Sequence, residues 1–210
     1  MSNNELHAND KITETMINIG KYEWVKPKLF LKLISLAKAI DDGIVFERHE
    51  DLALAAYVLI DKDKDKNTAV RITPTLLSLF GVTKDQLFSD ALANTERLCE
   101  PSFTSLDALA RNTDRTNKYV LYDENNISGS AVFLLPYVQK LISTVMDGNY
   151  YIVPSSTQEL IFVKEDKNLL PMLRDTLRSV NRSELIDESI MLSDNVYLFD
   201  QKTKLIRIAK

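Results

Sequence analysis

From residue 119 to residue 208, pairs of short apolar runs alternate with single amphipathic stretches, and this order restricts the fold more than any other feature of the chain. The apolar runs over residues 119–122, 130–135, 150–153, 159–163, 196–199 and 205–208 are predicted to be strands. Single helices are predicted from Pro136 onward and over residues 169–180, which gives the order β-β-α-β-β-α-β-β. This order is typical of an α+β fold, a largely antiparallel sheet with helices packed on one face, and not of a doubly wound parallel sheet.

The first half of the chain is also predicted to mix helices and strands. Apolar residues recur at helical spacing at Val25, Leu29, Leu33, Ile34, Ala37 and Ile40. This spacing predicts a helix that begins near Tyr22 and ends at residues 41–43, Asp-Asp-Gly. The uncharged run 52–60 predicts a strand covered on both faces, with further strands over residues 44–48 and 69–73.

Local signals predict three more helices in this half. Residues 74–80 begin with Pro and are followed by Gly81, which is typical of a short helix and its end. Thr83 and Gln86 match a capping box, T-x-x-Q, that opens a second helix. Another short helix is predicted over residues 105–110.

The domain organisation is predicted to be two subdomains behind a flexible tail. Residues 1–21 are predicted to be a flexible N-terminal tail, because their few apolar residues keep no sustained period. Residues 22–110 are predicted to form an N-terminal α+β subdomain, and residues 118–210 a C-terminal one. The segment 111–117 contains no apolar residue and is predicted to be an exposed loop or linker.

Charge and composition argue against several classes of function. A formal net charge of −4 argues against a globally basic nucleic-acid binder. One Cys and two His are too few for a thiolate or histidine metal site, so no metal and no cofactor are expected. No apolar run approaches the roughly 20 residues that span a bilayer, and the N-terminus does not read as a signal peptide. We therefore expect a cytoplasmic protein with no membrane partner.

One acidic segment resembles the start of a calcium-binding loop. Asp61-x-Asp63-x-Asp65 matches the first ligand positions of an EF-hand, which requires Gly at its sixth position and Glu at its twelfth. Lys66 and Ile72 occupy those positions. The segment is therefore predicted to be a solvated hairpin tip, and no metal site is predicted.

A nucleophilic site would need an adjacent base and an orienting group. Cys99 is the only thiol in the chain, and His49 lies in the charged segment 47–51. A Cys99–His49 dyad is one alternative. Because no local signature surrounds Cys99, a structural or incidental role is expected for both residues.

The most concentrated polar segment between two apolar runs is 154–159, Pro-Ser-Ser-Thr-Gln-Glu. Rigid flanking strands would present its hydroxyls and carboxylate as a recognition site. Pro and Ser are also ordinary turn formers, and no G-x-S-x-G elbow or nearby His supports a nucleophile. A recognition site and an ordinary turn are therefore both open as interpretations of this segment. The candidate ligand-binding residues are Ser155, Ser156, Glu159, Asn181, Arg182 and Asp194.

Three arginines line one face of the last predicted helix, at Arg174, Arg178 and Arg182. Such a stripe could hold phosphate groups. Because Asp175 and Glu184 lie close by, a solvated face or intramolecular pairing is the expected alternative.

Several segments together resemble a known family. They are 118–122 (KYVLY), 129–136 (GSAVFLLP), 150–159 (YYIVPSSTQE), 180–182 (VNR) and 192–197 (LSDNVY), with 51–54 (DLAL) and 91–95 (ALANT) upstream. Over residues 29–208 the chain resembles a bacterial family known only as domain of unknown function 5688, although the family typically has a longer N-terminal region. Gln158 stands where the family pattern has His, so no His-dependent role carries over to this position. The resemblance implies an intracellular bacterial protein associated with mobile genetic elements, and it implies no activity, cofactor or catalytic residue.

Three functions are compatible with the sequence. The expected one is a non-catalytic interaction or accessory protein with a protein partner. The first alternative is an enzyme or small-ligand binder that uses the 154–159 turn. The second is an accessory protein that acts on a host-defence or nucleic-acid system, although a net charge of −4 is too modest for a DNA mimic. A concave pocket with convergent polar groups at the 154–159 turn would favour the small-ligand binder or enzyme, and a convex surface the interaction protein.

Overall fold

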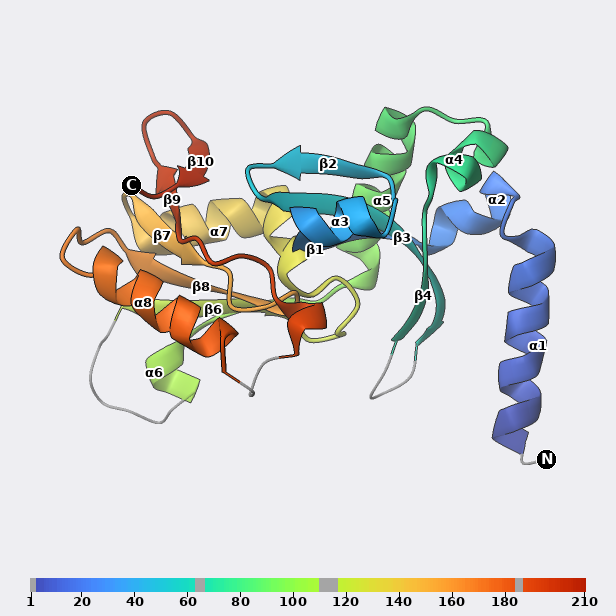
Figure 1. The fold of residues 1–210 in the computed structure, drawn as a ribbon, viewed down its shortest axis with the longest axis horizontal. Coiled ribbons are helices and arrows are strands. Elements are labelled where there is room, and N and C mark those ends of the chain that lie inside the picture. Colours follow the sequence, from blue (N-terminus) through green and yellow to red (C-terminus); the bar gives the residue numbers. More distant parts are fainter. Residues whose placement is uncertain (1–2, 63–66, 110–116, 184–186) are drawn as a thin grey trace.

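Two antiparallel sheets share one core in the computed structural model, which describes residues 3–62, 67–109, 117–183 and 187–210 (Figure 1). The first sheet is built around the long strand β3 (Leu52–Lys62). Its other strands are β1 (Leu29–Ser35), β2 (Phe46–His49) and β4 (Asn67–Arg71), in the order β1-β3-β2 with β4 also paired to β3. Residues 52–58 are all buried, as predicted for an apolar strand covered on both faces.

The second sheet has the order β10-β9-β7-β8-β6-β5, and all of its neighbouring strands are antiparallel. Its strands are β5 (Pro101–Ser105), β6 (Lys118–Asp123), β7 (Tyr150–Val153), β8 (Glu159–Lys164), β9 (Tyr197–Asp200) and β10 (Leu205–Ile208). The predicted α+β class with antiparallel pairing is confirmed, including the terminal hairpin of β9 and β10.

Helices connect and cover these strands. They are α1 (Asn3–Asn18), α2 (Tyr22–Val25), α3 (Leu36–Asp41), α4 (Pro74–Phe80), α5 (Lys84–Leu98), α6 (Leu106–Leu109), α7 (Pro136–Met146) and α8 (Leu170–Asn181), with 3-10 turns η1 (Lys26–Lys28), η2 (Gly129–Leu134) and η3 (Glu188–Ile190). Two helix ends follow the predicted signals. The Oγ1 of Thr83 accepts a hydrogen bond from the Gln86 amide at 3.1 Å, and Gly81 ends α4 with a φ of 67°.

The helix predicted from Tyr22 to Ile40 is wrong in its central part. Residues 29–35 form β1, which pairs along its whole length with β3, and only residues 36–41 are helical after it. The apolar residues here fit a helical period, but they also form a nearly continuous apolar run, which periodicity alone does not distinguish from a buried strand. Burial on both sides of β1 favours the strand.

Side chains from elsewhere protect the outer edge of β1. The backbone amide of Leu31 donates a hydrogen bond to Thr95 Oγ1 at 2.9 Å, and its carbonyl accepts one from Ser128 Oγ. These bonds satisfy backbone groups that an edge strand would otherwise leave unpaired. They also hold α5 and the loop before η2 against the first sheet.

The strand predicted over residues 130–135 is also wrong, because residues 129–134 form the 3-10 turn η2. Gly129 has a φ of +55°, and a Cβ atom there would lie 2.3 Å from the carbonyl oxygen of Thr157. Only a glycine allows this turn and this close approach together. The chain therefore turns inward, and residues 129–133 are all buried.

Strand pairing crosses the boundary predicted between the two subdomains. Residues 101–105, assigned above to the N-terminal subdomain, form β5 at the edge of the second sheet and pair with β6. One cluster of buried side chains contains Leu33 and Leu54 of the first sheet together with Ile152 and Phe162 of the second. Of the expected loop 111–117, residues 111–116 lie outside the described residues.

Helices cover both faces of the second sheet, and not one face as predicted. Val138 and Ile142 of α7 belong to the same buried cluster as Tyr150 and Ile152. Leu173 of α8 belongs to a separate cluster with the alternate residues of β7, Tyr151 and Val153. Because successive side chains of a strand point to opposite faces, α7 and α8 lie on opposite sides of β7 (Figure 1).

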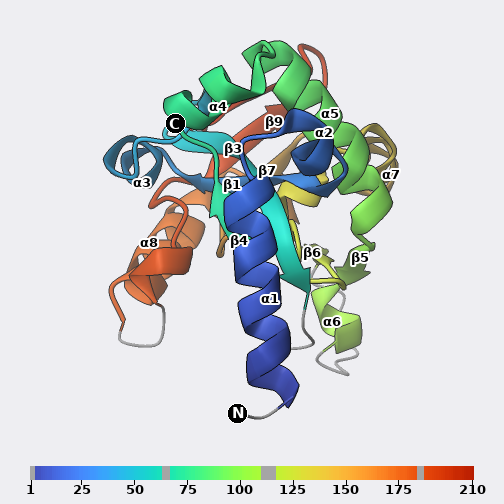
Figure 2. The ribbon, with the colours of Figure 1, turned by 90° about the vertical axis from the view of Figure 1, so that its right-hand side faces the viewer.

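The N-terminal tail predicted over residues 1–21 contains a helix, α1. Figure 2 shows α1 extending from the first sheet toward the N-terminus. Lys11 of α1 pairs with Asp61 of β3, and Trp24 Nε1 donates to the Glu14 carboxylate at 3.1 Å. The flexibility of this segment stays a prediction.

Candidate functional site

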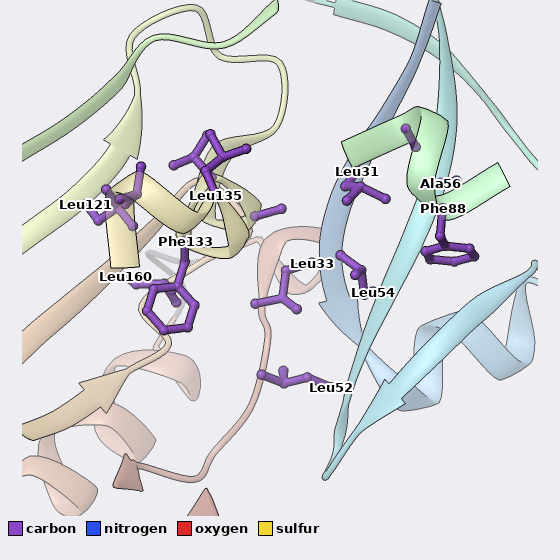
Figure 3. Close-up of a cluster of buried hydrophobic side chains, with 14 of the residues drawn as sticks. Leu31, Leu33, Leu52, Leu54, Ala56, Phe88, Leu121, Phe133, Leu135 and Leu160 are labelled. Atoms are coloured by element: carbon purple, nitrogen blue, oxygen red, sulfur yellow. The ribbon is translucent and has the colours of Figure 1, made fainter. Parts of the chain in front are cut away.

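A pocket of about 340 Å³ lies between the two sheets. Its walls come from β1–β3 and the β2–β3 turn on one side, and from η2, β7, β8, β9 and β10 on the other. The lining residues are Leu33, Arg48, His49, Glu50, Leu52, Ser130, Ala131, Phe133, Leu134, Ile152, Pro154, Leu160, Tyr197 and Ile206. Figure 3 shows Leu33 and Leu52 pointing from the first sheet toward Phe133 of η2. Apolar side chains therefore make up most of the pocket.

The charged groups of the pocket come from one short segment, the end of β2 and its turn into β3. His49 pairs with Leu52, so Glu50 and Asp51 are the two turn residues. Arg48, His49 and Glu50 are exposed, and each also lines the pocket. The Arg48 Nε donates to the backbone oxygen of Glu50 at 3.0 Å. This bond fixes the guanidinium beside the turn.

Asp51 joins this turn to the end of the chain. Its Oδ2 accepts hydrogen bonds from Ser193 Oγ at 2.6 Å and from Asn195 Nδ2 at 3.1 Å, and its Oδ1 accepts one from the phenol of Tyr197. Tyr197 itself lines the pocket. The bonds to Asp51 therefore hold the pocket wall formed by β9 against the wall formed by the first sheet.

The hydrogen bonds to Asp51 determine its ionisation. Burial acts to raise the pKa of Asp51, but the bonds from Ser193, Tyr197 and Asn195 favour the charged form, and the net pKa is lowered. Burial, and then the bond to Asp51, raises the pKa of the Tyr197 phenol far above its ordinary value. The pair is thus a carboxylate and a neutral phenol at neutral pH.

The predicted 154–159 segment forms a turn next to this pocket. Ser155 Oγ donates to Glu159 Oε1 at 2.9 Å, and Ser156 Oγ accepts from the Gln158 amide at 3.1 Å. Of the segment, only Pro154 lines the pocket between the sheets. The polar groups of Ser155, Ser156 and Glu159 therefore bond within the turn, which supports the turn interpretation of this segment.

The turn also braces η2. Thr157 O accepts hydrogen bonds from the Ser130 amide at 3.0 Å and from Ser130 Oγ at 3.1 Å. The Thr157 amide donates to the carbonyl of Ile190 at 2.8 Å. Because Ser130 and Pro154 both line the pocket, these bonds position two of its walls.

The remaining candidate residues lie at the end of α8. Asn181 Nδ2 donates to the carbonyl of Ser193 at 3.1 Å and to Asp194 Oδ1 at 2.9 Å, which joins α8 to the segment before β9. Arg182 follows α8 and is exposed. The structure thus brings Asn181 and Asp194 together. As ligand-binding residues, all six candidates stay a prediction.

The arginine stripe does not present three free cations. Arg174 donates to the carbonyl of Ala209, near the C-terminus. Arg178 is exposed. Binding of phosphate at this stripe has no further support in the described residues.

Cys99 and His49, the two residues of the hypothetical dyad, have different environments. Burial, and then the nearby Asp123, raises the pKa of Cys99 to about 12, so its thiol is protonated at neutral pH. Cys99 is not among the residues that line the pocket, whereas His49 is. No hydrogen bond within the described part of the chain orients the His49 ring. This arrangement supports no nucleophilic pair.

A second, shallower groove of about 240 Å³ runs between α8 and the second sheet. Ser155 lines it, together with Val153, Met172 and Val180. Met172 and Val180 are 48% and 41% exposed. The groove therefore offers an apolar surface with little polar chemistry.

Sequence reasoning missed the pocket and its charged residues. Glu50 and Asp51 belong to the charged segment 47–51, to which no site was assigned, and Asp51 meets Tyr197 only in the folded chain. The one available signal was the resemblance, since residues 51–54 and 192–197 were both among its matching segments.

Two further properties concern the described residues alone. None of their helices has the length and apolar character needed to cross a membrane. No three His, Cys, Asp or Glu side chains among them are grouped so as to hold a metal ion. Asp63 and Asp65 of the acidic loop lie outside the described residues, so the predicted lack of a calcium site there stays a prediction.

Comparison with known proteins identifies a family for the chain from its sequence. A family model described as a family of unknown function (DUF5688) matches residues 3–201. No curated protein and no solved structure matches the chain.

Proposed function

Since the chain belongs to DUF5688, a family of unknown function, we propose a function from its own geometry: it is a non-catalytic protein that binds a small, mainly apolar molecule in the pocket between its sheets. The observation that carries this proposal is the pocket itself. Its volume of about 340 Å³ is at the lower end of the range of roughly 300–1,000 Å³ for small-molecule sites.

The distribution of polar groups supports binding of a molecule with one polar end. Leu33, Phe133, Ile152 and Leu160 supply apolar walls, and the charged lining residues come from residues 48–50. Such a site would gain affinity from burial of apolar surface, and its few polar groups would fix orientation. This is the small-ligand alternative of the sequence analysis, with the site moved from the 154–159 turn to the neighbouring pocket.

The chemistry of the lining residues supports binding without catalysis. The phenol of Tyr197 donates to Asp51 and has a raised pKa, so it is poorly suited to act as a base. His49 has no orienting partner among the described residues, and Ser130 Oγ donates to Thr157 O. A general base or nucleophile normally needs such an oriented partner.

The pocket can be tested by filling it. Ile206 of β10 lines the pocket and is 38% exposed, whereas its neighbour Leu205 does not line it and is 61% exposed. Fluorescence titration with 1-anilinonaphthalene-8-sulfonate, a probe with an apolar aromatic body and one anionic sulfonate, should show saturable binding to the parent. Ile206→Trp should weaken this binding about tenfold or more, because the indole occupies the pocket, and Leu205→Trp should not. Equal binding by both variants would overturn the proposal.

A second candidate is the interaction or accessory protein that the sequence analysis expected. The exposed Met172 and Val180 of the α8 groove support a protein partner there. Met172→Glu with Val180→Glu should abolish capture of a partner from the native cell, whereas Leu141→Glu on α7, 47% exposed, should not. A cytoplasmic, bacterial setting and a link to mobile elements or to host defence stay predictions of this second candidate.

A further inference from the structure

The pocket is bordered by a cation, Arg48, and an anion, Glu50. Within the described residues, Arg48 and Glu50 form no ion pair with each other or with any other side chain. Both residues line the pocket. From this juxtaposition we propose that the ligand is a zwitterion, an α-amino acid with a large apolar side chain. The inference rests on the proposed function of the pocket.

The hydrogen bond of Arg48 leaves its binding groups available. Its Nε is engaged by the Glu50 carbonyl at 3.0 Å, whereas no bond to a described residue engages its two terminal nitrogens. Those nitrogens present parallel N–H donors that match the two oxygens of a carboxylate. Arg48 therefore binds the α-carboxylate of the amino acid.

Glu50 supplies the complementary charge. A ligand with a carboxylate alone would bring its charge close to that of Glu50, and a ligand with an ammonium alone would face Arg48. A zwitterion satisfies both residues, because its ammonium group binds the Glu50 carboxylate. The apolar side chain then enters the space between Leu33, Phe133 and Leu160.

The backbone of Glu50 adopts a conformation that is uncommon for this residue type. Its φ of +56° lies in the left-handed region, at a hairpin turn where Gly, Asn and Asp are preferred. A glutamate here strains the backbone, as does Lys204 at a φ of +59°, which does not line the pocket.

Calorimetric titration of the full chain tests the ligand class. The probes are L-leucine, L-methionine, L-phenylalanine and L-tryptophan, followed by the deaminated acid, the decarboxylated amine and the neutral alcohol of the tightest binder. We expect at least one amino acid to bind about tenfold or more tightly than each of its three analogues, because only the zwitterion pairs with both charges.

Variants assign each charge to its residue. Arg48→Gln should weaken binding of the amino acid and of the acid but not of the amine, and Glu50→Gln should weaken binding of the amino acid and of the amine but not of the acid. Glu47→Gln is the matched control, since Glu47 lies on β2 and does not line the pocket.

Two results would overturn the inference. One is an alcohol, acid or amine that binds as tightly as its amino acid, and the other is no detectable binding of any amino acid in the panel. In either case the fluorescent probe with Ile206→Trp and Leu205→Trp still decides separately whether the pocket binds small molecules at all.

Discussion

The phenol of Tyr197 on β9 donates a hydrogen bond to the carboxylate of Asp51 in the β2–β3 turn, across a sequence separation of 146 residues. The bond joins the last part of the second sheet to the first sheet at the edge of the pocket. Ser193 and Asn195 donate to the other carboxylate oxygen. One acidic side chain thus links the two walls of the pocket.

Removal of the phenol hydroxyl should destabilise the chain. In Tyr197→Phe we expect the free energy of unfolding at pH 7 to fall by about 2 kcal/mol, the typical worth of a hydrogen bond to a charged group. Urea denaturation followed by circular dichroism measures this change. Tyr137→Phe, at a tyrosine that is 47% exposed, should change stability by less than about 0.5 kcal/mol. Equal effects of the two variants would contradict the role of the Tyr197–Asp51 bond.

The same carboxylate should make stability depend on acid pH. The folded-state pKa of Asp51 is lowered, so it lies below the unfolded value of about 3.9. The stabilisation from ionised Asp51 is therefore complete above that value and is lost as pH falls through the folded pKa. The difference in unfolding free energy between the parent and Asp51→Asn should be constant from pH 7 to pH 5 and shrink below pH 4. A difference that grows on acidification would contradict this account.

Gly129 should tolerate no side chain. A Cβ atom there meets the Thr157 carbonyl at 2.3 Å, and the φ is +55°. We expect Gly129→Ala to lower the free energy of unfolding by about 3 kcal/mol, from backbone strain and the forced shift of the turn. Gly43→Ala has a similar φ of +60° with nothing within 4 Å, and should cost only about 1 kcal/mol. The difference in unfolding free energy between the two variants, measured by thermal or urea unfolding, gives the cost of the close approach to the Thr157 carbonyl.

Glu50 should show opposite effects on stability and on binding. Glu50→Gly should raise the free energy of unfolding by about 0.5 kcal/mol, because glycine adopts a positive φ without strain. The same variant should bind amino acids more weakly. Lys204→Gly, at another position of positive φ, 59°, is a control that should gain similar stability and keep binding unchanged. Loss of stability in Glu50→Gly would contradict the strain argument.

The 154–159 turn should be structural. Ser155→Ala with Ser156→Ala should lower the free energy of unfolding by about 1 kcal/mol, because both hydroxyls bond within the turn. Binding of the fluorescent probe should be unchanged. If the double variant keeps its stability but loses binding, the hydroxyls belong to the site and the turn interpretation is wrong.

Local signals in the sequence were reliable where one segment decided the structure. The Thr83 cap, the Gly81 helix end and the β9–β10 hairpin all follow from neighbouring residues. The helix predicted over the residues of β1 is wrong, because their apolar run fits a helix as well as a strand. Only the pairing with β3 determines that they form a strand. The sequence did not predict the pocket for a related reason. Glu50 and Asp51 are ordinary charged residues until the fold places Tyr197 and Phe133 beside them.

The position of a bound ligand tests the central claim most directly. Two-dimensional NMR of the isotope-labelled chain, titrated with 1-anilinonaphthalene-8-sulfonate, reports which amides sense the probe. We predict saturable shifts at Glu50, Ser130 and Phe133, which line the pocket between the sheets. Shifts confined to Thr176 and Val180, which line the groove under α8, or an absence of saturable shifts, would contradict the claim that this pocket is the binding site.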